Sequence, residues 1–99
     1  MDEYMQYNWR ITSIKYKASG LPRMDGRYPQ RINSIIQFLH LDLDNVLVWD
    51  YISDNIGNPK VGRMRTSLVT GVNSNPDGDA LVITTLNTVY HFEKVGRIT

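Results

Sequence analysis

The stretch Ala80-Leu-Val-Ile-Thr-Thr-Leu-Asn-Thr-Val-Tyr-His-Phe-Glu-Lys-Val95 decides the fold class. It is rich in β-branched and aromatic residues, which favour strands. Its centre, Leu86-Asn87, predicts a two-residue hairpin loop in which Asn87 is able to adopt the left-handed conformation. Strands are therefore expected over residues 80–85 and 88–95, with alternate side chains of each on opposite faces.

Working outward from this hairpin, the sequence predicts three further strands. One covers residues 65–72 and precedes the turn Asn73–Asp79, so that the last third of the chain forms a three-stranded meander. Another, Val46–Ile52, places its larger side chains, Leu47, Trp49 and Tyr51, on one face. The first covers residues 7–17, and its apolar positions change phase, which indicates a bulge near Thr12-Ser13.

The segment 31–40 allows two interpretations. Ile32, Ile35, Ile36 and Leu39 follow the i, i+3, i+4, i+7 spacing of an amphipathic helix, and Pro29 stands where such a helix can begin. The isoleucines are β-branched, which favours a strand instead. We prefer the helix, docked on the sheet because it is too short to be stable alone.

These elements predict one domain over residues 1–99, of the mainly β (α+β) class. We expect a small, strongly bent antiparallel sheet or partly open barrel of about five strands, with the short helix near 31–40 closing one end. A flat sheet would leave an apolar face exposed. The expected core consists of Trp9, Trp49, Tyr90 and Phe92.

Composition excludes several function classes. The 99 residues carry a net charge of +1, which argues against a dedicated binder of nucleic acid or membrane surfaces. Cysteine is absent, so disulfides, thiolate metal sites and a cysteine nucleophile are excluded. No apolar run is long enough to span a bilayer, and the N-terminus is acidic and polar, unlike a signal peptide. A cytoplasmic protein is expected.

Charge is nevertheless unevenly distributed along the chain. Residues 10–31 contain six basic residues and a single acidic one, Asp25. Residues 32–59 contain four aspartates and no lysine or arginine. Lys60, Arg63 and Arg65 then restore positive charge. The ordinary explanation of this distribution is that the oppositely charged segments lie side by side and form ion pairs. The more specific explanation is a dipolar surface that steers one partner.

Arginine and tyrosine together are typical of binding surfaces, because both are enriched at interface hot spots. The long loop 18–30 and the segment after it supply most of them. The candidate partner-binding residues are Arg23, Arg27, Tyr28, Arg31, Tyr51, Arg63 and Arg65. On a bent sheet the same arginines would also suit a nucleic-acid groove.

Catalytic and metal-binding signals are weak, and neither an enzyme nor a cofactor is expected. The run Asn73-x-Asn75-x-Asp77-Gly78-Asp79 matches the opening of a calcium loop, but the twelfth position is Thr84 and the flanks read as strands. Local Asx hydrogen bonds explain the same residues. His40, near Asp42 and Asp44, and His91 are the two histidines, and no nucleophile motif accompanies either.

Thr66-Ser67-x-Val69 and Ile83-x-Thr85-x-Asn87-Thr88-x-Tyr90 resemble a pattern found in small uncharacterised β-rich proteins of bacteria, prophages and other mobile elements. The likeness covers residues 65–92, about a third of the chain. It implies a small accessory protein of a bacterium or phage and implies no active-site residue.

We therefore expect a non-enzymatic protein that acts through protein–protein contact, for example as a counter-defence inhibitor. Contact through an unpaired strand edge, or a homodimer formed by sheet edges, is included in this expectation. The alternatives are a small nucleic-acid-binding barrel with an arginine-rich face, and a small-ligand-binding protein or small enzyme.

Overall fold

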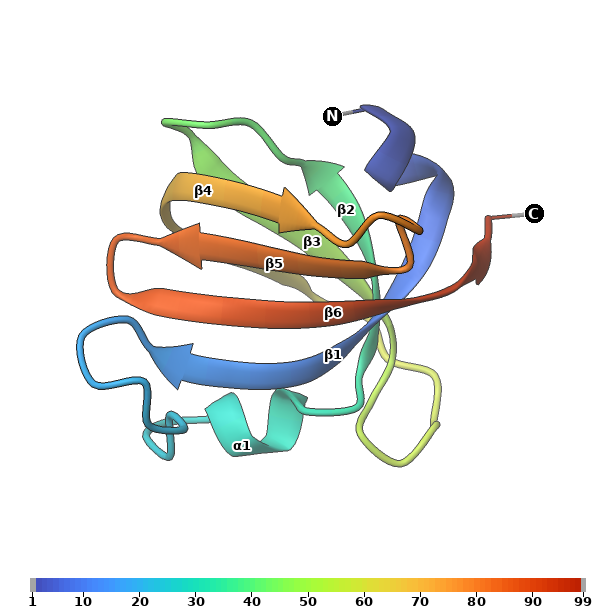
Figure 1. Cartoon of the computed structure of the whole chain (residues 1–99). Helices are drawn as coiled ribbons and strands as arrows, with labels where there is room; N and C mark the ends of the chain where they lie inside the picture. Colours follow the sequence, from blue (N-terminus) through green and yellow to red (C-terminus); the bar gives the residue numbers. More distant parts are fainter. Residues whose placement is uncertain (1, 99) are drawn as a thin grey trace.

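The computed structural model describes residues 2–98, which form one closed antiparallel barrel (Figure 1). The strands follow one another around the barrel in chain order, and the last strand pairs with the first. They are β1 (Tyr7–Tyr16), β2 (Ile35–His40), β3 (Val46–Ser53), β4 (Arg63–Ser74), β5 (Ala80–Thr85) and β6 (Thr88–Arg97). A 3-10 turn, η1 (Asp2–Gln6), precedes β1, and a one-turn helix, α1 (Tyr28–Arg31), precedes β2. The mainly β class is confirmed, although the strands number six rather than five and the barrel is closed.

Strand β1 contains the predicted bulge. Trp9 and Ile11 are buried, the register against β6 shifts between Ile11 and Ser13, and the next buried residue is Ile14. The extra residue changes the phase of the strand, because side chains otherwise alternate with period 2. Both halves of β1 therefore direct apolar side chains into the barrel.

The predicted helix at 31–40 is wrong: residues 35–40 are strand β2, and the helix lies earlier, at 28–31. Asn33 has φ +72°, a left-handed conformation that ends the helical turn. Within β2, Ile36 and Phe38 are buried and Leu39 is exposed. Pairing with β1 and β3 makes the segment a strand, in which alternate side chains are buried. The helix-like spacing of the isoleucines and Leu39 therefore does not determine its structure.

The C-terminal meander is confirmed, with β4, β5 and β6 paired in order. Leu86 and Asn87 form the loop between β5 and β6, as predicted. Among described non-glycine residues, however, only Asn33 and Asp44 have positive φ, so Asn87 does not adopt the left-handed conformation. Lys17 holds this loop instead, by donating its N–H to the carbonyl of Asn87 at 2.9 Å.

The core is a chain of aromatic rings that crosses the barrel, and all four predicted core residues belong to it. Ring centroids lie 6.0 Å apart for Trp9 and Phe38, 5.0 Å for Phe38 and Phe92, and 5.9 Å for Phe92 and Trp49. Tyr90 packs on Trp49 at 5.4 Å. The last three of these contacts are edge-to-face, a preferred geometry for aromatic pairs. Since these rings fill the interior, binding has to take place on the outer surface or at the ends.

Closure also changes the expectation of an unpaired strand edge. Each described strand has two neighbours, and the part of β1 beyond β2 is covered by the following loop. There Tyr16 N–H donates to the carbonyl of Leu21, and Arg23 N–H donates to the carbonyl of Ile14, both at 2.9 Å. The free edge that suggested strand addition is thus absent from the described strands. A homodimer stays a prediction, without that edge to support it.

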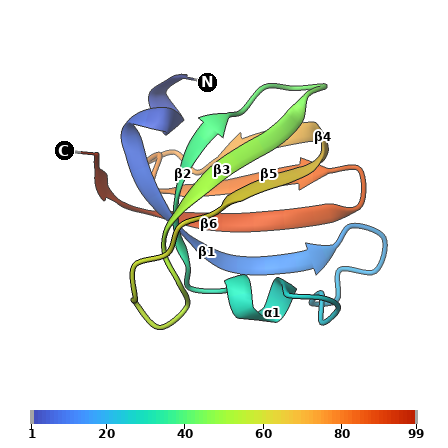
Figure 2. The same cartoon turned by 180° about the vertical axis from the view of Figure 1, so that it is seen from behind.

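Helix α1 and the β3–β4 loop, residues 54–62, project from the same end of the barrel (Figures 1 and 2). The loop is shaped by Asp54, whose Oδ1 accepts hydrogen bonds from the N–H groups of Ile56 and Asn58 at 3.0 and 2.9 Å. Gly57 supplies the φ of +90° that the turn requires. This end of the barrel gathers most of the predicted binding residues.

Candidate functional site

A basic pocket of about 330 Å³ lies between the α1 segment and the β3–β4 loop. Arg27 and Arg31 line it from one side, and Lys60 and Arg63 line it from the other. Tyr51 and Val61 also line this pocket, which we call the basic pocket. No acidic side chain is present among the described residues that line it. Two segments far apart in sequence therefore converge their positive charges on one small volume.

Aromatic rings, rather than carboxylates, position two of these cations. Lys60 Nζ lies 4.0 Å from the centroid of the Tyr51 ring, and Arg31 Cζ lies 4.8 Å from that of Tyr28. A ring face attracts a cation without cancelling its formal charge. Among the described residues, Arg27, Arg31 and Lys60 form no ion pair. The pocket therefore keeps its positive charge.

Arg63 differs from these three cations because a carboxylate holds it. Its Nε donates to Asp50 Oδ1 at 2.9 Å and its Nη2 donates to Asp50 Oδ2 at 3.3 Å. The hydrogen bond from Arg63 lowers the pKa of the Asp50 carboxyl. A second hollow of about 400 Å³ continues from the basic pocket past this pair and shares Tyr51, Lys60 and Val61 with it. Arg63 thus forms the boundary between a basic region and a mixed one.

Tyr51 forms the inner wall of the basic pocket. It points inward from β3 and is 8% exposed. Its hydroxyl oxygen and the neighbouring core atom Trp49 Nε1 are both buried without a hydrogen-bond partner among the described residues. Burial raises the pKa of the Tyr51 phenol, and the positive charge of Arg31 acts in the opposite direction. Tyr51 therefore stays neutral at physiological pH, and its ring contacts the ammonium group of Lys60.

Arg23 lies in a separate, neutralised cluster. Its Nε and Nη2 donate to the two oxygens of Asp25 at 3.0 and 2.6 Å, and its Nη1 donates to Thr88 Oγ1 at 2.7 Å. Tyr16 donates its hydroxyl to Asp25 at 2.8 Å. Arg23 first and Tyr16 second hold the pKa of the Asp25 carboxyl well below its usual range. Arg23 thus ties the loop after β1 to β6, and its charge is balanced.

Tyr28 lies between the two groups. Its ring contacts the guanidinium of Arg23 at 3.9 Å as well as that of Arg31 at 4.8 Å. It is half-buried, and two cations already occupy its surroundings. The ring therefore positions arginines and leaves little free surface for stacking on a base.

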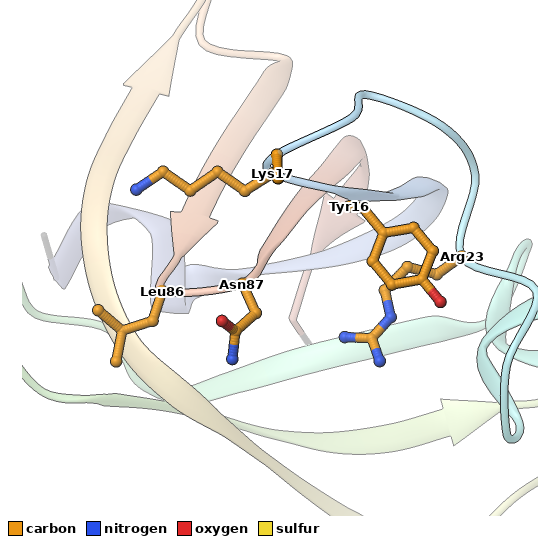
Figure 3. A pocket seen from close by; sticks show the side chains of 6 residues that line it. Tyr16, Lys17, Arg23, Leu86 and Asn87 are labelled. Carbon is orange, nitrogen blue, oxygen red and sulfur yellow. The ribbon is translucent and has the colours of Figure 1, made fainter.

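A larger open pocket of about 680 Å³ lies beside this cluster, where the end of β1 meets the β5–β6 hairpin. Figure 3 shows Lys17 extending away from Tyr16 and Arg23, with Leu86 and Asn87 along the hairpin. Among the described residues that line it, Arg23 is the only cation besides Lys17, and Asp25 balances the charge of Arg23. This pocket is therefore far less positive than the basic pocket.

The structure brings together four predicted site residues in the basic pocket: Arg27, Arg31, Tyr51 and Arg63. Tyr28 supports Arg31 from behind. Arg65 does not line this pocket; it is exposed on β4, opposite Val48 of β3. Lys60 and Val61 were missed as site residues. The available signal was the apolar Val61 in a polar turn, directly after a lysine.

The other chemical candidates are held by local contacts. Asn75 Oδ1 accepts hydrogen bonds from the N–H groups of Asp79 and Ala80, both at 3.0 Å, so the Asn73–Asp79 turn has the Asx bonding anticipated for it. His40 donates from Nδ1 to the carbonyl of Val46 at 3.1 Å, and its Nε2 lies 3.3 Å from Asp42 Oδ2. No group of three or more His, Asp or Glu side chains with metal-binding geometry occurs within residues 2–98.

His91 lies on β6, away from His40 on β2. It is half-buried, and burial first and the charge of Lys15 second lower its pKa. The two histidines therefore belong to separate surroundings.

Comparison with protein-family models, curated proteins and solved structures finds no match to this chain. Within residues 2–98, no helix has the length and apolar character needed to cross a membrane.

Proposed function

We propose that this chain is a non-enzymatic binding protein that holds a partner protein against its basic pocket. The observation that carries the proposal is Val61, whose side chain is fully exposed and lines the same pocket as four cations. Apolar groups surrounded by arginine and tyrosine are the composition of a protein–protein hot spot.

Further apolar surface surrounds the same loop. Ile56 is 76% exposed and Ile52 is 42% exposed. Complete burial of one such side chain contributes about 1.5–3 kcal/mol to association. An acidic partner surface would add electrostatic steering and specificity through Arg27, Arg31 and Lys60. Apolar contacts thus supply affinity, and the cations select the partner.

Nucleic acid is the second candidate, and the convergence of four cations favours it. Arginine donates forked hydrogen bonds to phosphate, and lysine adds charge. The aromatic rings count against this candidate, because cations already cover Tyr28 and Tyr51. Stacking platforms for single strands need free ring faces. The exposed apolar side chains also contribute nothing to phosphate contact.

The finer part of the proposal concerns biological setting. The resemblance of residues 65–92 to small β-rich proteins of bacteria and phages supports a cytoplasmic accessory factor. Such a protein would act by covering a surface that its target needs, as a counter-defence inhibitor does.

The first test is capture of partners with the tagged protein from a lysate of its own organism or host, with and without nuclease. We expect a stoichiometric protein partner that survives nuclease. Capture should be lost in Val61→Asp and weakened in Arg27→Gln/Arg31→Gln. Arg65→Gln is the matched control, because Arg65 lies on β4 two residues after Arg63 and does not line the pocket.

If the captured proteins disappear after nuclease treatment, nucleic acid would be the partner and the proposed protein contact would be contradicted. Equal capture by the parent chain, Val61→Asp and Arg27→Gln/Arg31→Gln would show that this face is not the binding surface. Circular dichroism of each variant separates loss of binding from loss of folding.

A further inference from the structure

We infer that the basic pocket binds a phosphate monoester dianion, carried by a phosphorylated side chain of the partner protein. The inference deepens the proposed function and rests on it, because it names the anion that the partner presents to Arg27, Arg31 and Lys60. Charge balance, the way the cations are held and the size of the pocket all support a phosphate monoester.

The charge of the pocket matches a dianion better than a monoanion. Three cations of the pocket, Arg27, Arg31 and Lys60, have no ion pair among the described residues, and Arg63 is shared with Asp50. A single carboxylate would balance one of them. A phosphate monoester carries about −1.5 to −2 charges at pH 7 and presents three acceptor oxygens. Of the common side-chain anions, the phosphate monoester therefore comes closest to neutralising the pocket.

The cations are also prepared for such a ligand. Lys60 and Arg31 are held against Tyr51 and Tyr28, so less side-chain freedom is lost when they bind an anion. Neither ring accepts the charge-assisted hydrogen bonds that the ammonium and guanidinium groups are able to donate. Among the described residues, Arg31 and Lys60 donate to no carboxylate, unlike Arg23, which donates to Asp25. No carboxylate therefore competes with a phosphate for these two cations.

Size and surroundings favour a phosphate on a protein over one on a nucleic acid. The pocket volume of about 330 Å³ is near the lower limit for ligand sites, which suits one group rather than a chain of nucleotides. A nucleic-acid phosphodiester carries a single negative charge and would leave two of the three unpaired cations unbalanced. Val61 is positioned to contact the peptide that carries the phosphate.

The test is a titration with the peptide acetyl-Gly-phosphoSer-Gly-amide, followed by amide NMR shifts. The same peptide with Asp or Ser at its centre provides the comparison. We expect the phosphopeptide to cause saturable shifts centred on residues 27–31 and 60–63. It should bind at least about tenfold more tightly than the Asp peptide, and the Ser peptide should cause no saturable shifts.

Variants locate the binding. Arg31→Gln and Lys60→Gln should each raise the dissociation constant of the phosphopeptide about tenfold. This is the loss expected for one charge-assisted hydrogen bond. Arg65→Gln should leave the affinity unchanged. Lys60→Gln keeps the inference testable if Arg31→Gln disturbs the packing of Tyr28, since Lys60 projects from a loop.

The pH dependence of phosphopeptide affinity is a second test of the dianion. The second pKa of a phosphorylated side chain is about 6, so binding should strengthen as pH rises from about 5.0 to 7.5. The charged and titratable groups that face the site are Arg27, Arg31, Lys60, Arg63, Tyr51 and Asp50. The hydrogen bond between Arg63 and Asp50 lowers the pKa of Asp50 and raises that of Arg63, and burial raises the pKa of Tyr51, so these three shifts all point away from neutral pH. Neither His40 nor His91 lines the pocket.

Three results would overturn the inference. They are equal binding of the Asp and phosphoserine peptides, tighter binding of an oligothymidine without terminal phosphate, and no shift at residues 27–31 and 60–63. In each case, nuclease-resistant capture that depends on Val61 would leave the proposed function intact. Phosphopeptide binding without any captured protein would instead support the site and contradict the proposed partner.

Discussion

At the scale of single residues, the partner of each arginine decides whether its charge is available. Arg23 is held by the carboxylate of Asp25, whereas Arg31 is held by the ring of Tyr28. Both side chains have a contact that positions them, but only the second keeps an uncompensated charge. Counting arginines in a sequence therefore overestimates the binding surface, because a neutralised arginine serves the fold.

The Arg23–Asp25 pair makes stability depend on pH. Because the folded pKa of Asp25 is lowered, its carboxylate stabilises the fold above the unfolded pKa of about 3.9. That contribution is lost as pH falls. Asp25→Asn should therefore be less stable than the parent at neutral pH, and the difference should shrink as pH falls from about 5 to 2. Urea unfolding at several pH values measures it.

Asp77→Asn is the control for this experiment, since Asp77 has no ion pair among the described residues. Its difference from the parent should be small at neutral pH. A gap between Asp25→Asn and the parent that stays constant down to about pH 2 would contradict the assignment.

At this scale the sequence identified the residue types of the site but not their grouping. Arg27, Arg31 and Arg63 were predictable from loop position and charge. The exclusion of Arg65 depends on how far along β4 each arginine lies, because Arg63 and Arg65 share one face of that strand. Lys60 was counted among the basic residues, yet its placement over Tyr51 requires a contact between a loop and a strand. Such contacts are set by tertiary packing, which a single sequence does not reveal.

At the scale of elements, two residues of β2 separate the strand interpretation of residues 31–40 from the helix interpretation. Phe38 is 1% exposed and lies between Trp9 and Phe92, and Leu39 is 37% exposed. Phe38→Ala should lower the free energy of unfolding by about 3–5 kcal/mol. Leu39→Ala should lower it by only about 0.5 kcal/mol. Chemical denaturation of both variants measures the difference, and a larger effect at Leu39 would favour the helical interpretation.

The misassignment of β2 has a clear physical origin. Four apolar residues at helical spacing are also compatible with a strand when neighbouring strands supply partners on both sides. The sequence around Asn33 carried the decisive signal, because asparagine tolerates positive φ and so separates helix from strand. The hairpin at Leu86-Asn87 was predictable because its partners are adjacent in sequence, although its backbone geometry was not.

At the scale of the whole molecule, the aromatic chain should make unfolding cooperative. Trp9 on β1 and Trp49 on β3 are both fully buried and are linked through Phe38 and Phe92. We expect Trp9→Phe and Trp49→Phe, each with one remaining tryptophan, to give a fluorescence transition that coincides with that of far-UV circular dichroism. Separate midpoints within one variant would indicate that the two sides of the barrel unfold independently.

The size of the molecule also limits how it binds. A standard protein interface buries about 800 Å² on each partner. The described chain exposes 5754 Å², so such an interface would cover roughly one-seventh of it. An interface of standard size therefore leaves roughly six-sevenths of the surface in contact with solvent.

The pairing of β1 with β6 has a consequence for biosynthesis. These two strands lie about 80 residues apart in sequence, and β1 has no complete set of neighbours until β6 has been made. A ribosome translates the chain in one direction, so Trp9 and Ile11 remain accessible to chaperones and proteases throughout elongation. Nascent chains stalled before residue 88 should accordingly be digested readily, and protection should appear only after the final strand has left the exit tunnel.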